Sequence, residues 1–176
     1  FFEVWMAALL GPSKASFEEI LEANNPPSLL RGMTWMALAG GIATLIQLGV
    51  VFIQQPELRA FLAQIERETL LIGSVILILA VWIIPAIGLL IHSGAVALAS
   101  VAVGGRWDWR GQAMLTAAWQ APLTLIATAV LFVPMVNIIA GVVLAVYQLL
   151  LSLAATQAAQ DIDGIRAFGA QILANV

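Results

Sequence analysis

Four long segments without a charged side chain decide what this chain can fold into. Asp, Glu, Lys and Arg are absent from residues 33–53, 70–103, 113–132 and 136–155. A bilayer core of about 30 Å needs about 20 consecutive apolar residues in helical form. The sequence therefore predicts an all-α fold, a polytopic transmembrane helix bundle with four spans. Whether a fifth span follows is left open.

The composition excludes several classes of protein. Of the 176 residues 62% are hydrophobic and 10% are charged, whereas soluble domains are about a quarter charged. The net charge is -3 and the few Lys and Arg residues are scattered, so the basic surface that nucleic acid requires is missing and nucleic acid is not an expected partner. The absence of cysteine excludes disulfides, thiol chemistry, iron-sulfur clusters and lipid attachment through sulfur.

The pattern divides the chain into three regions. Residues 1–32 are predicted to be an amino-terminal interfacial segment, 33–157 the transmembrane bundle and 158–176 a carboxy-terminal amphipathic segment. Ser16 and Glu19 fit a capping box ahead of an amphipathic helix, which we expect to lie in the membrane interface. A solvated helix leading into the first span is the alternative. The last region is either a surface helix or the first turns of a fifth span.

The second apolar segment is too long for a simple span. Its 34 residues (70–103) would extend about 51 Å as a helix at 1.5 Å per residue. Either one long helix kinks near Pro85, or two short helices turn between Pro85 and Gly88. Such a turn leaves unpaired backbone groups in lipid, at a cost of several kcal/mol each. The single kinked helix is therefore favoured.

Two further predictions concern topology. Only Val133, Pro134 and Met135 link the last two segments, so these spans should form an antiparallel hairpin. With the second segment counted as one span, the excess of basic residues favours an amino terminus inside; two short helices there would reverse that side. The turn at residues 106–110 is cytoplasmic in both cases, and we expect a multi-pass protein of the bacterial inner membrane. With one span there, the residues expected on the cytoplasmic side are Lys14, Arg31, Arg106, Arg110 and Arg166.

Several short motifs resemble those of a known family. Segment 9–20 is similar to the pattern L-x-x-P-x-x-A-F-x-x-I at the start of prokaryotic Yip domain proteins, the Ypt-interacting-protein type. His92 on a long second helix, the glycine pair at 104–105 and Pro122 inside the third span also resemble that family. The resemblance implies a bacterial member with about five helical spans. Eukaryotic members associate with small GTPases, but no residue here supports carrying that role over.

His92 is the one histidine of the chain and lies four residues after Gly88. This spacing would let a flat macrocycle lie against the helix while the imidazole ligates its metal, which makes His92 a candidate pigment ligand. A histidine that hydrogen-bonds within the bundle or at an interface is the favoured interpretation, because the spacing is common by chance. The apolar segments hold no second metal ligand, so we expect no metal site and no cofactor other than bound lipid.

Gln120 and Gln148 lie at equal sequence distances on either side of Pro134. In a tight hairpin they should reach the same depth, where an interhelical hydrogen bond is worth about 0.6 to 2 kcal/mol. The prediction is a polar clamp between the third and fourth spans. The alternative is a polar lining for a substrate path, although coupled transport normally uses ionisable groups inside the membrane, and the four apolar segments contain no Asp, Glu, Lys or Arg.

Two more features are candidate contact sites. The turn between the second and third spans could recognise an anionic headgroup or a partner's cytoplasmic face, or could be an ordinary interfacial anchor. Small residues recur on the first span and make a face that another helix can approach closely. The turn comprises Arg106, Trp107, Asp108, Trp109 and Arg110, and the small-residue face comprises Ala37, Gly40, Gly41 and Thr44.

The sequence contains no nucleophile paired with a base, no phosphate-binding glycine loop and no paired carboxylates, so no enzymatic activity is expected. The predicted function is that of a non-catalytic accessory or scaffold subunit, packed against other integral membrane proteins and lipids in a larger complex. The first alternative is passive transport or lipid handling near Gln120. The second is a pigment-associated subunit with His92 as ligand.

Overall fold

The structure, a computed structural model, describes residues 2–130 and 136–175 and folds them entirely into helices and connecting turns. The all-helical prediction is confirmed. The predicted hairpin link at 133–135 lies outside the described residues. The helices are α1 (Phe2–Leu10), α2 (Lys14–Ala23), α3 (Leu29–Gln54), α4 (Pro56–Leu62), α5 (Arg67–Ala102), α6 (Trp109–Val130), α7 (Val136–Gln160) and α8 (Gly164–Ala174).

Within the described residues, 4 helices are long and apolar enough to cross a membrane. They are α3, α5, α6 and the part of α7 from Ile138 onward, and they coincide with the four predicted segments. The first span begins at Leu29 rather than at the predicted Met33. The helix starts after Ser28, whose hydroxyl accepts from the Arg31 backbone N–H at 3.3 Å. The start of this helix is therefore marked by its capping residue and not by the point at which charged residues end in the sequence.

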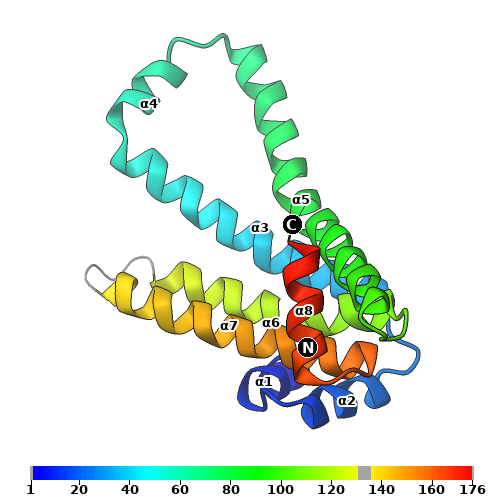
Figure 1. The fold of residues 1–176 in the computed structure, drawn as a ribbon. Helices are drawn as coiled ribbons and strands as arrows, with labels where there is room; N and C mark the ends of the chain where they lie inside the picture. The colour runs from blue at the N-terminus through cyan, green and yellow to red at the C-terminus, as the bar shows by residue number, and fades with distance from the viewer. Residues whose placement is uncertain (1, 131–135, 176) are drawn as a thin grey trace.

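The second span is one helix. α5 runs for 36 residues with Pro85 inside it, and its ribbon bends part-way along its length (Figure 1). Proline cannot donate to the preceding turn and so commonly bends a helix without ending it in a membrane. The preferred prediction is confirmed, and the alternative of two short helices is wrong.

The amino-terminal region differs from the prediction in two ways. The residue that caps α2 is Ser13, whose hydroxyl accepts from the Ser16 N–H at 3.2 Å. Assigning the cap to Ser16 was therefore wrong, because Ser16 already lies in the first turn. The sequence analysis assigned no secondary structure to residues 1–10, and there the structure forms α1, which packs against α2 and α6.

The bundle converges at one end and opens at the other (Figure 1). We call the converged end the base. There α1, α2 and α8 surround the parts of α3, α5, α6 and α7 that lie close together. From the base, the second half of α3 and the first half of α5 lead to α4 and form one arm, and the distal parts of α6 and α7 form another. None of the residues 45–80 in the first arm is buried.

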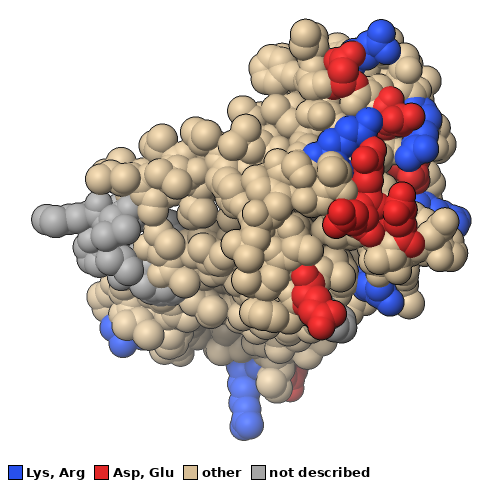
Figure 2. All heavy atoms as spheres, turned by 90° about the horizontal axis from the view of Figure 1, so that it is seen from below, with Lys and Arg blue, Asp and Glu red and all other residues tan. Residues whose placement is uncertain are grey.

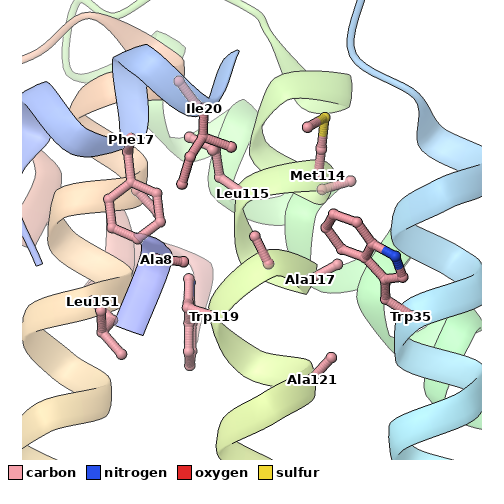
Figure 3. Close-up of a cluster of buried hydrophobic side chains, with 14 of the residues drawn as sticks. Ala8, Phe17, Ile20, Trp35, Met114, Leu115, Ala117, Trp119, Ala121 and Leu151 are labelled. Carbon is pink, nitrogen blue, oxygen red and sulfur yellow. The ribbon is translucent and has the colours of Figure 1, made fainter. Parts of the chain in front are cut away.

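The apolar core lies in the base and is built around α6 (Figure 3). Trp35 from α3 packs on one side of α6, while Phe17 and Ile20 from α2 and Leu151 from α7 pack on the other. All four side chains are at most 5% exposed. α6 is accordingly the most buried of the four candidate spans. α8 packs against α5 and α7.

Charged side chains gather on one part of the base, and the surface that leads toward the α6 and α7 arm is largely uncharged (Figure 2). One ion pair ties the two ends of the chain, since the Lys14 ammonium lies 3.1 Å from an Asp161 carboxylate oxygen. Hydrogen bonding to Asp161 raises the pKa of Lys14, and the same bond lowers the pKa of Asp161. Both groups are well exposed, so solvent screens their attraction.

Candidate functional site

Two hollows flank the contact between α6 and α7, and they share the side chains of Trp119 and Gln148. The smaller hollow has a volume of about 190 Å³ and lies where α3, α6 and α7 separate. The larger, of about 540 Å³, lies among α5, α6, α7 and α8. Both combine apolar side chains with uncharged polar ones. No Asp, Glu, Lys or Arg lines either hollow.

The smaller hollow brings together the two glutamines that the sequence paired. Gln120 is half-buried, Gln148 is exposed, and both line this hollow together with Gln47 of α3. No hydrogen bond joins the side chains of Gln120 and Gln148 among the described residues, and Gln47 has no side-chain partner there either. The predicted clamp is therefore not seen as a direct hydrogen bond.

His92 lines the larger hollow from α5. Its imidazole makes no hydrogen bond to the described part of the chain, so the predicted bond within the bundle is not seen. The same hollow is lined by Gln148 and Ser152 of α7, by Gln171 of α8 and by Asn175, the residue that follows α8. No group of three or more His, Cys, Asp or Glu side chains that could hold a metal ion occurs among the described residues.

A buried polar network in the base was missed by the sequence analysis. Gln112 donates to Thr156 at 3.4 Å and accepts from Gln160 at 3.5 Å, and Gln171 of α8 donates to Thr156 at 2.8 Å. These four side chains are at most 8% exposed. The sequence did contain a sign of this network. Gln112 and Thr116, and likewise Thr156 and Gln160, are four residues apart, so each pair places two polar side chains on one face of its helix.

The predicted turn at residues 106–110 is attached to that network, although its last two residues, Trp109 and Arg110, already lie in the first turn of α6. The Gln160 amide donates to the Asp108 carbonyl at 3.0 Å, and the Arg106 guanidinium donates to the Ala159 carbonyl at 3.0 Å. The Asp108 carboxylate accepts from the Gly111 N–H at 2.9 Å and so caps α6. Trp107 is 55% exposed, and Arg110 lies over the Trp109 ring at 5.9 Å.

The small-residue face of α3 lies against α5. A Cβ atom at Gly40 would come within 2.6 Å of the Pro85 ring, and one at Gly41 within 2.5 Å of the Trp82 ring. Ala37 and Thr44, the other members of this face, are half-buried. The close approach of α3 to α5 thus depends on glycine at two consecutive positions.

Comparison with known proteins gives no relative. No family model, no curated protein and no solved structure matches this chain. The Yip domain resemblance therefore stays a prediction from short motifs.

Proposed function

We propose that the protein is a non-catalytic integral membrane protein that acts as an accessory or scaffold subunit, packing against other membrane proteins. The observation that carries the proposal is the set of amides in the smaller hollow. Gln47, Gln120 and Gln148 come from three separate helices, line one hollow and have no side-chain partner in the described chain.

The argument rests on what can satisfy an amide in hydrocarbon. Lipid tails offer no hydrogen bond, and leaving a buried amide unpaired costs several kcal/mol in an apolar solvent. A helix from another protein can supply donors and acceptors, each interhelical bond being worth about 0.6 to 2 kcal/mol. The long exposed apolar faces of the two arms provide the surface on which such a helix would pack.

Native electrophoresis after gentle solubilisation tests this proposal. The wild-type protein should migrate in a stable complex larger than itself, and the double variant Gln47→Leu, Gln120→Leu should shift most of it to the free form. The matched control is Gln54→Leu, the same exchange at the end of α3 and outside the hollow. A wild-type protein that migrates alone would refute the accessory role.

A second candidate, lipid handling, is favoured by a different observation. The larger hollow lies directly beside the smaller one and shares Trp119 and Gln148 with it, which makes a nearly continuous, uncharged polar path along α6 and α7. Mass spectrometry of the purified protein should then detect a retained amphiphile in near-stoichiometric amount. Only trace amounts of many lipids would argue against it.

A further inference from the structure

We propose that the larger hollow binds the headgroup of a membrane-dissolved amphiphile whose neutral ring carries hydrogen-bond-accepting carbonyl groups, the chemistry of a quinone. This inference rests on the lipid-handling candidate, and it shares only Gln148 with the accessory-subunit proposal, since that residue lines both hollows. Three observations lead to it: the depth of the hollow, its charge and the donors that line it.

Depth excludes a phospholipid headgroup. His92 lies ten residues before the end of α5 at Ala102, which is about 15 Å along the helix axis. Gln148 lies twelve residues before the end of α7 at Gln160, about 18 Å from it. Half of a hydrocarbon core is about 15 Å. The hollow is therefore near the middle of the bilayer if the polar turn after α5 marks the interface.

Charge points the same way. A phosphate or a carboxylate at this depth would require a cationic partner, and the lining contains no Lys or Arg. The ligand must therefore be uncharged and soluble in the hydrocarbon core. The volume of about 540 Å³ falls within the usual range for small-molecule sites, about 300 to 1,000 Å³.

The polar side chains offer unsatisfied donors. The His92 imidazole and the Gln148 amide have no partner in the described chain, although both line the hollow. The Trp119 side chain also lines the hollow, but its indole nitrogen is itself fully buried and is not counted as a donor to a ligand. Unpaired polar groups at an apolar site call for a ligand. Carbonyl oxygens on the ligand would accept from His92 and Gln148.

Shape favours a flat ring rather than an ester or an alcohol. Trp119 and Phe168 stand in the lining with Leu149 and Ile172, and aromatic side chains pack well on planar rings. Ring and carbonyl groups together describe a quinone headgroup, whose apolar tail could extend along the exposed faces of α5 and α7.

The test uses the full chain in nanodiscs of synthetic phosphatidylcholine, with decylubiquinone as the probe. Binding is followed as the saturable part of tryptophan fluorescence quenching. Decylbenzene, with an aromatic ring and the same tail but no carbonyls, competes for any merely apolar site. The expected result is saturable binding that decylbenzene does not displace. Absence of saturation, or displacement by decylbenzene, would overturn the proposal.

Variants locate the site. His92→Phe keeps a ring but removes the hydrogen bond and should weaken binding at least tenfold, while His92→Gln, which retains a donor, should recover part of that loss. The matched control Gln54→Leu lies at the end of α3, outside both hollows, and should alter the Kd less than twofold. An unchanged Kd in His92→Phe would overturn the assignment.

Photolabelling keeps the proposal testable if a His92 variant fails to fold. An azido derivative of decylubiquinone should label wild-type peptides covering residues 145–152 or 168–175, which line the hollow. Labelling confined to other helices would overturn it. So would a visible absorption band of the purified protein that is lost in His92→Ala, because that result identifies a metal macrocycle as the occupant. Retained amphiphiles of another class would keep lipid handling and reject the quinone.

Discussion

The base and the arms use the same polar side chain in opposite ways. In the base, Gln112 and Gln160 are at most 1% exposed and hydrogen-bond to each other and to neighbouring helices. Between the arms, Gln47 and Gln148 are exposed and have no side-chain partner in the described chain. A buried amide whose hydrogen bonds are all made within the chain stabilises the fold. An exposed amide without a partner in the chain can still hydrogen-bond to another molecule. The difference suggests that the base stabilises the chain and the arms meet an external partner.

The largest expected effect is at the base. Gln160→Leu removes the amide that bonds the backbone of Asp108 and the side chain of Gln112. It leaves the buried Gln112 oxygen and the half-buried Asp108 backbone groups without these partners. Unfolding free energy should fall by about 2 to 4 kcal/mol, measured by denaturation in micelles. The control is Gln157→Leu, the same exchange one turn earlier on α7 at a half-buried position. Equal losses in both variants would contradict the special role of the network.

Replacing glycine by alanine should lower the stability where α3 packs against α5 and raise it on the exposed part of α3. Gly41→Ala places a methyl group 2.5 Å from the Trp82 ring, which should cost about 1 to 3 kcal/mol through overpacking. Gly49→Ala, on the exposed part of α3, meets no atom within 4 Å and should stabilise by about 0.5 to 1 kcal/mol through helix propensity. Thermal unfolding of both variants measures this. Matching signs would show that α3 and α5 do not pack closely at Gly41.

A double-mutant cycle compares the two sets of amides. Gln120→Leu and Gln148→Leu should be additive within about 0.5 kcal/mol, because no bond joins them. Gln112→Leu and Thr156→Val, whose side chains are bonded, should show a coupling of about 0.5 to 1.5 kcal/mol. A coupling energy between Gln120 and Gln148 would contradict this expectation and would support the hydrogen-bonded clamp predicted from the sequence.

The smallest effect concerns the exposed ion pair. Because its pKa is lowered below the ordinary 3.8, Asp161 contributes stability above pH 3.8 that is lost as the pH falls through the lowered value. Lys14, whose pKa is raised above 10.5, contributes below that pH and loses its contribution as the pH rises through the raised value. The difference in thermal stability between the wild-type protein and Asp161→Asn should therefore be small. It should not change with pH between the lowered pKa of Asp161 and the raised pKa of Lys14. Asparagine tolerates the φ of 53° at this position, and a difference that grows at low pH would contradict the assignment.

Residue patterns predicted most of the secondary structure but little of the site. The absence of charges predicted α3, α5, α6 and α7, since hydrocarbon admits few other arrangements of backbone. Single-residue choices failed where two candidates compete: both Ser13 and Ser16 can cap α2, and only the backbone conformation selects Ser13. Gln120 and Gln148 were assigned to one depth and do line one hollow, but equal depth does not bring two side chains within bonding distance.

The sequence by itself determined that this protein consists of apolar helices long enough to span a bilayer. In lipid each backbone N–H and C=O group needs a partner, and a helix supplies these partners within its own segment. Only the tertiary structure decided which polar side chains are satisfied. The network in the base joins residues 44 and more positions apart in α6 and α7, and the hollow beside His92 needs four helices to form. Such contacts depend on the angles at which helices cross and on where they separate. The hydrophobic pattern of one helix does not predict these angles.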